Sequence, residues 1–111
     1  MADAPLGSFE EQVLLAVLRT GAEAYGMAVR REIESVTRRD VAIGAVYATL
    51  DRLEAKGMVD SGRAAGGGGG SRRLFALTTA GAAALAETRA MRDRLWRGVD
   101  LDALLEGPQP G

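Results

Sequence analysis

The sequence contains neither cysteine nor histidine, and these absences exclude several kinds of chemistry. Without cysteine there is no disulfide, no thiolate nucleophile and no cysteine zinc finger, and without histidine the commonest general base is missing. The remaining candidates are carboxylates such as Glu10 and Glu11, or Glu32 and Asp40. Nothing in the pattern gathers a pair of them in an apolar pocket, so we expect no catalytic residue, no metal and no cofactor.

Long apolar runs are missing as well, since no segment approaches the ~18 residues that a membrane helix needs. Residues 1–7 show no basic segment followed by an apolar one, so we expect no signal peptide. The 111 residues are 47% hydrophobic, which is enough for one core. These features, with the lack of cysteine, predict a single cytoplasmic domain outside the membrane.

The net charge of −1 argues against nucleic acid when it is taken alone, but the charge is unevenly distributed. Residues 1–37 carry three basic and six acidic side chains, residues 38–73 seven and four, and residues 74–111 four and five. A phosphate backbone responds to a local patch more than to the total charge. The middle segment is therefore where we expect a polyanion to bind, with an ordinary mixed surface as the alternative.

Apolar residues at helical spacing predict four helices, over about 8–20, 25–36, 44–56 and 79–105. The last would be roughly 40 Å long, longer than a domain this small can cover. An apolar stripe along it therefore needs a partner, and a two-fold homodimer is the simplest one.

Local signals refine the ends of these helices. Ser8 and Glu11 form a capping-box pattern, and Thr78 or Thr79 can cap the last helix. Gly57 is expected as a left-handed C-cap. The stretch "RRDVAI" between the second and third helices has β-branched residues and is predicted to form one brief strand.

Five consecutive glycines separate "MVDSGRA" from "RRLFALT". A phosphate-binding loop would need Gly-Lys-Ser/Thr and then a helix, whereas this run leads into a predicted strand. An interdomain linker would leave one strand and one helix beyond it, too little for a core. The remaining interpretation, which we favour, is the tip of a β-hairpin.

The third helix has two contrasting faces. At 100° per residue, Val46, Leu50 and Leu53 share the core side. The very small residues Gly44, Ala48 and Ala55 lie opposite, with Arg52 and Ala45 to one side and Tyr47 on the flank. Such a face either is ordinary surface or allows close approach to a DNA groove.

The order of elements predicts a mostly α (α+β) fold, a winged helix-turn-helix with a C-terminal dimerisation helix. The third helix would be the recognition helix and the hairpin the wing. We expect the winged domain over residues 1–78, the dimerisation helix over 79–106 and a flexible tail over 107–111.

Three stretches, "VLLAVLRTGAEAYGMAVRREIE", "GAVYATLDRLEAKGMV" and "SRRLFALTTAG", resemble the PadR family of transcriptional regulators, in its subfamily with a short C-terminal helix. The resemblance implies a dimeric repressor on a pseudo-palindromic operator, with Tyr47 on the recognition helix and Arg72 and Arg73 at basic wing positions. The chain departs from the family where Leu74 and Phe75 replace two frequent aromatics and where glycine fills the wing tip.

From the charge pattern, the third helix and this resemblance we expect a set of DNA-contacting residues. They are Arg38, Arg39, Ala45, Tyr47, Ala48, Thr49, Arg52, Lys56, Arg63, Arg72 and Arg73.

A second set is expected at the dimer interface or in a ligand pocket. It comprises Phe9, Val13, Leu85, Met91, Leu95, Trp96 and Val99. Some short relatives bind flat hydrophobic compounds between their final helices through a tryptophan, which suggests a small hydrophobic effector at Trp96. The alternative is that Trp96 only packs the interface, as large aromatics commonly do.

One further function stays open at this point: a winged-helix protein-interaction module that binds no DNA. The acidic total charge and the glycine-filled wing favour it.

Overall fold

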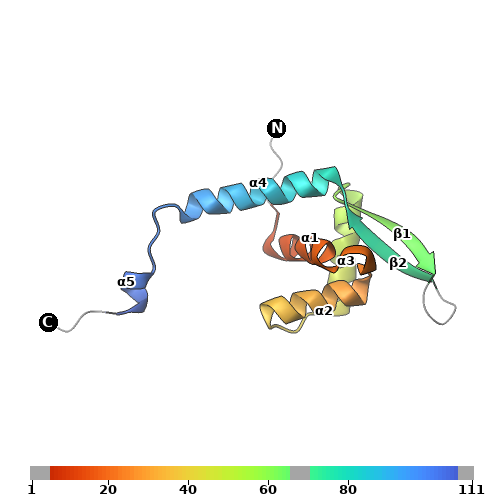
Figure 1. Ribbon diagram of the computed structural model, residues 1–111, viewed down its shortest axis with the longest axis horizontal. Helices are drawn as coiled ribbons and strands as arrows, with labels where there is room; N and C mark the ends of the chain where they lie inside the picture. Colours follow the sequence, from red (N-terminus) through yellow and green to blue (C-terminus); the bar gives the residue numbers. More distant parts are fainter. Residues whose placement is uncertain (1–5, 66–70, 108–111) are drawn as a thin grey trace.

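The computed structural model describes residues 6–65 and 71–107 and is mostly helical, with one two-stranded antiparallel sheet (Figure 1). The predicted fold class is confirmed. The elements are α1 (Ser8–Thr20), the 3₁₀ turn η1 (Gly21–Glu23), α2 (Gly26–Thr37), α3 (Ile43–Ala55), β1 (Val59–Ala65), β2 (Ser71–Leu77), α4 (Thr79–Trp96) and α5 (Asp102–Leu105).

The core lies between α1, α2, α3 and the base of the hairpin, because each helix has one apolar stripe that must be buried. Leu14, Leu50 and Leu53 are fully buried at its centre. The third helix turns its predicted core stripe inward, which leaves its small-residue face outside. The other buried apolar side chains include Val13, Val17, Val29, Ile33, Val46, Val59 and Phe75.

Two of the three capping predictions are confirmed. The Thr78 hydroxyl accepts a hydrogen bond from the Gly81 amide at 3.0 Å, and Gly57 is left-handed at φ 76°. The capping box is one residue off: the Gly7 amide donates to Oε1 of Glu10 at 3.1 Å. Glu11 is instead engaged by Arg92 of α4, a tertiary contact that local sequence does not reveal.

The hairpin pairs Val59 with Leu77 at its base and Ala65 with Ser71 at its outer end. The predicted tip, residues 66–70, lies outside the described residues. Across the described chain, the predicted strand in "RRDVAI" is absent, because Arg38 ends α2 in a left-handed conformation (φ 58°) and α3 begins five residues later.

A different segment, the residues just before α2, pairs with the outer edge of β2. Tyr25 forms an antiparallel bridge with Leu74, and the Phe75 amide donates to the Ala24 carbonyl at 2.9 Å. The segment before α2, not the one after it, therefore lies beside β2.

The prediction of one continuous helix over 79–105 is wrong. The helix α4 stops at Trp96, Gly98 takes a left-handed φ of 77°, and α5 forms only one turn. Asp100 helps to begin this turn, since its carboxylate accepts from the Asp102 amide at 2.9 Å. The 18 residues of α4 span about 27 Å.

The helix α4 contacts the rest of the molecule as far as Arg92, which is bound to Glu11 of α1. Thr88 is buried there and its hydroxyl accepts from the Leu6 amide at 3.3 Å. The later part projects past α1 and leads to α5, away from the helical core (Figure 1). In the described part of the chain, no helix combines the length and apolarity needed to cross a bilayer.

Candidate nucleic-acid interface

The outward face of α3 is small and exposed, as expected. Gly44, Ala45, Ala48 and Ala55 are all exposed and none carries a side chain larger than a methyl group. The helix backbone can therefore approach another surface closely, as insertion into a major groove requires.

Two larger side chains, Tyr47 and Arg52, border this small-residue face. The ring of Tyr47 is 37% exposed and lies over Gly26 of α2, where an added Cβ would stand 2.3 Å from Cζ of the tyrosine. Thr49, by contrast, is only 3% exposed, and its hydroxyl accepts a hydrogen bond from Arg52 at 3.3 Å. Thr49 therefore faces the interior, and its expected DNA contact does not fit the structure.

The cations at the end of α3 are balanced by Glu10 of α1. Nζ of Lys56 lies 2.9 Å and Nε of Arg52 3.9 Å from Oε2 of Glu10. The hydrogen bond from Lys56, followed by that from the Gly7 amide, lowers the pKa of Glu10. The carboxylate is thus ionised at neutral pH and offsets part of the positive charge that the sequence places on this helix.

Arg73 is held in a similar way on the other side of α3. Its guanidinium lies 2.8 Å from Asp51 and 2.7 Å from Glu54, and it also donates to Ser61 at 3.2 Å. A hydrogen bond from Ser61 and then that from Arg73 lower the pKa of Glu54. Hydrogen bonding to Asp51 in turn raises the pKa of Arg73. Arg73 therefore fastens the hairpin to α3, and its charge is already paired at the wing position where we expect a DNA contact.

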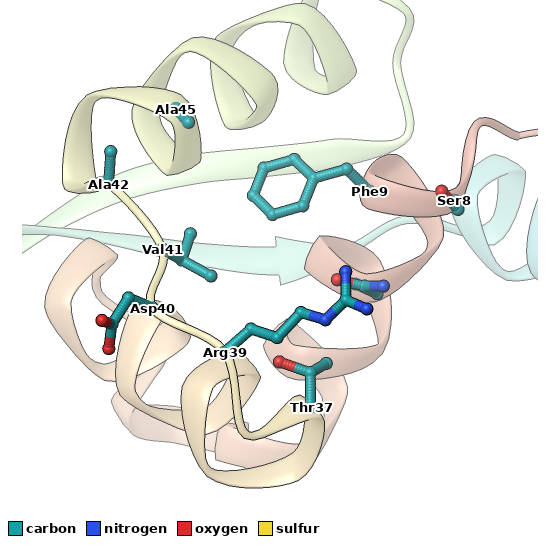
Figure 2. Close-up of a pocket in the computed structure, with 9 residues that line it drawn as sticks. Ser8, Phe9, Thr37, Arg39, Asp40, Val41, Ala42 and Ala45 are labelled. Atoms are coloured by element: carbon teal, nitrogen blue, oxygen red, sulfur yellow. The ribbon is translucent and has the colours of Figure 1, made fainter.

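Arg38 and Arg39 keep their charge available. Both are exposed in the loop before α3, and within residues 6–65 and 71–107 neither has a carboxylate within 4 Å. Figure 2 shows Arg39 extending from this loop toward α1 while Asp40 points away from it. In the wing, Arg63 and Arg72 are exposed on neighbouring strands.

A hollow of about 470 Å³ lies beside the start of α3, between this loop and the first turn of α1. The ring of Phe9 projects into it (Figure 2). Phe9 is therefore placed near the recognition helix. Val13 is fully buried in the protomer core, so the expectation of both residues at an exposed interface is wrong for Val13.

The remaining residues of the expected interface follow α4 outward. Leu85 and Met91 are half-buried, whereas Leu95 is 70%, Trp96 54% and Val99 51% exposed. Leu104 and Leu105 of α5 are still more exposed, at 80% and 79%. We call the segment from Leu95 to Leu105 the apolar arm.

The protein has three helices, the third of which exposes mainly small residues, followed by a hairpin that is bonded to this third helix. This arrangement defines a winged helix-turn-helix protein. The chain belongs to the transcriptional regulator PadR-like family, whose model matches residues 14–87. It is accordingly a transcription regulator of a DNA-binding family and not an enzyme, as the sequence predicts.

Solved structures agree with this assignment. A PadR family transcriptional regulator from Eggerthella lenta is 26% identical, with 86% of this chain and 82% of that chain covered and a TM-score of 0.64. RosR of H. salinarum is 27% identical, with 86% and 81% covered and a TM-score of 0.64. A PadR-like regulator from Bacillus cereus shares the fold at 20% identity, with 90% and 93% covered and a TM-score of 0.71. Among curated protein sequences, none is significantly similar to the chain.

Proposed function

We propose that this regulator is a cytoplasmic homodimeric repressor that binds a pseudo-palindromic operator and is released by a small hydrophobic effector. The observation that carries the proposal is the apolar arm, which the protomer leaves uncovered. Six large apolar side chains of this arm are exposed: Leu95, Trp96, Val99, Leu101, Leu104 and Leu105.

The shape of the protomer supports a partner for this arm. Its radius of gyration is 17.6 Å, and it extends over 70 × 36 × 20 Å. A compact domain of this length would have a radius of gyration of roughly 13 Å. Large exposed apolar side chains gathered in one segment indicate an interaction site, and a second copy brings an identical apolar arm with it. A two-fold pair buries both.

Such a dimer also explains how a weakly charged chain would select an operator. Each copy of α3 would enter a major groove, and the two grooves of successive half-sites lie ~34 Å apart. The small face of α3 permits the approach, Tyr47 and Arg52 flank it, and Arg38 and Arg39 supply positive charge at its start.

The effector is proposed to bind between the two copies of the apolar arm, beside Trp96. Occupancy there favours a dimer whose two α3 helices are wrongly spaced for the operator, which lowers the affinity for DNA.

DNA binding by α3 can be tested with the DNA that lies upstream of the protein's own gene. We expect a salt-sensitive gel shift for the wild type and a large loss of affinity for Tyr47→Ala combined with Arg52→Ala. Arg89→Ala on the exposed surface of α4 removes one positive charge elsewhere and serves as the control.

Two results would contradict this proposal. One is equal binding by the wild type and the double variant. The other is the absence of salt-sensitive DNA binding together with a stable complex between this chain and another protein, which would favour the interaction module.

A further inference from the structure

Tyr25 brings two arginines from separate elements together on one aromatic ring. Cζ of Arg72, on β2, lies 4.3 Å from the ring centroid, and Cζ of Arg31, on α2, lies 5.8 Å from it. Arg31 also donates a hydrogen bond from Nη2 to the tyrosine hydroxyl at 2.6 Å. Both distances fall within the range of cation–π attraction, so the ring holds both guanidinium groups in place.

These two cations lack the partners that their neighbours have. Arg30 lies 3.6 Å from Glu34, and Arg73 is bound by two carboxylates. Within the described ranges, neither Arg31 nor Arg72 has a carboxylate within 4 Å, and both are exposed. Two like charges gathered on one ring repel each other, and an anion placed between them would relieve that repulsion.

The position of the cluster indicates which anion. Tyr25 immediately precedes Gly26, over which the ring of Tyr47 from α3 lies, and it is bridged to Leu74 of the hairpin. The cluster is therefore continuous with the flank of the recognition helix and with the wing. A duplex that receives α3 in its major groove presents its phosphate backbone to surfaces at the flank of that helix.

We propose that Tyr25, Arg31 and Arg72 form a clamp for a backbone phosphate of DNA. Arg31 and Arg72 contact the phosphate, and Tyr25 is the positioning residue that aims both. This clamp rests on the proposed DNA binding by α3, and it adds affinity that does not depend on base sequence. Arg72 is among the sequence-predicted contacts, whereas Tyr25 and Arg31 are not, because only the bridge to β2 brings them beside Arg72.

Because a phosphate clamp does not depend on sequence, it can be tested on a labelled random-sequence duplex. The measurement is the slope of the logarithm of affinity against the logarithm of salt concentration. We expect Arg31→Gln or Arg72→Gln to reduce the magnitude of this slope by about one for each clamp engaged. Each should weaken binding roughly tenfold, as loss of a hydrogen bond to a charged group would.

The variants at Tyr25 separate positioning from simple charge. Tyr25→Phe keeps the ring under Arg72 but removes the hydroxyl that holds Arg31, so it should weaken binding less than Tyr25→Leu does. Arg31→Lys retains the charge and should restore most of the slope. Arg89→Gln on α4 is the charge-matched control and should leave the slope unchanged.

The possible outcomes distinguish failure of the clamp from failure of the proposed DNA binding by α3, on which the clamp depends. A wild-type chain without salt-dependent DNA affinity would remove both. If the wild type binds DNA with salt-dependent affinity but Arg31→Gln shows the same salt slope as the control Arg89→Gln, the clamp alone is overturned. A change confined to the thermal midpoint of Arg31→Gln, with its slope intact, would likewise assign the cluster a purely structural role.

Discussion

Two glycines show how single residues control the approach of neighbouring elements. Gly81, in the first turn of α4, lies so close to the chain that an added Cβ would stand 2.2 Å from the Met58 carbonyl oxygen. At Gly26 the added Cβ would meet the ring of Tyr47 at 2.3 Å. The obstacle is backbone in the first case and the outer end of a partly exposed side chain in the second, so the two sites should respond differently to alanine.

We predict that Gly81→Ala lowers the free energy of unfolding by about 2 kcal/mol or more, as overpacking against a fixed group does. Gly26→Ala should cost less stability, because the Tyr47 ring can swing outward, but it should weaken DNA binding by displacing that ring. Chemical denaturation and a DNA titration on both variants test this pair. Equal losses of stability would show that Tyr47 is as fixed as the backbone.

At the scale of elements, α4 divides into a part that belongs to the domain and a part that does not. Thr88 and Arg92 are fastened to Leu6 and Glu11, whereas Leu95 and the residues after it contact little of the protomer. The left-handed Gly98 then redirects the chain into α5. The apolar arm thus offers two short apolar surfaces joined by a bend, in place of the single long stripe that the sequence predicts.

The proposed dimer makes Leu95 a sensitive position. We expect Leu95→Glu to convert a dimer, with twice the 11.6 kDa mass of the chain, into a monomer, because it places charge in the apolar contact. Ala86 is exposed on the opposite face of α4 from Leu95, so Ala86→Glu is the control and should leave the dimer intact. Light scattering measures both, and a wild-type chain that is monomeric at working concentration would contradict the proposal.

At the scale of the whole molecule, the proposed effector site and the proposed DNA-binding surface lie at opposite ends of the protomer. Trp96 stands on the apolar arm, while α3 and the hairpin lie on the opposite side of the molecule from α5 (Figure 1). Within one protomer, α4 runs from the end of β2 to Trp96. We therefore expect the effector to act through the two α4 helices, by changing the relative placement of the two protomers.

This coupling predicts a signal from the only tryptophan in the chain. A planar cationic dye should quench the emission of Trp96 saturably, and small-angle scattering of the dye-bound dimer should report a changed distance between protomers. Both are measured without DNA, because such dyes also bind nucleic acid. Trp96→Ala should remain dimeric but lose the change in shape, and a flat emission titration would count against the effector.

Much of the fold follows from local pattern. Apolar spacing predicts α1, α2 and α3, because a stripe at helical spacing has to be buried whatever it meets. The hairpin is predicted by the glycine run between two short segments. The site was only partly predictable. The outward face of α3 follows from that spacing, but Thr49 lies at the edge of the stripe, where only the packed neighbours determine whether a side chain is covered.

The sequence by itself determined α1, α2, α3, the hairpin, the small residues on the outward face of α3 and membership of the family, because these depend on residues close together in the chain. The tertiary structure alone decided which cations remain available for a polyanion. Glu10 offsets Lys56 and Arg52, Asp51 and Glu54 hold Arg73, and Tyr25 gathers Arg31 beside Arg72. Charge pairing acts through space over a few ångströms. Residues as far apart in sequence as Glu11 and Arg92, which are separated by 81 positions, come within that range only once the chain has folded.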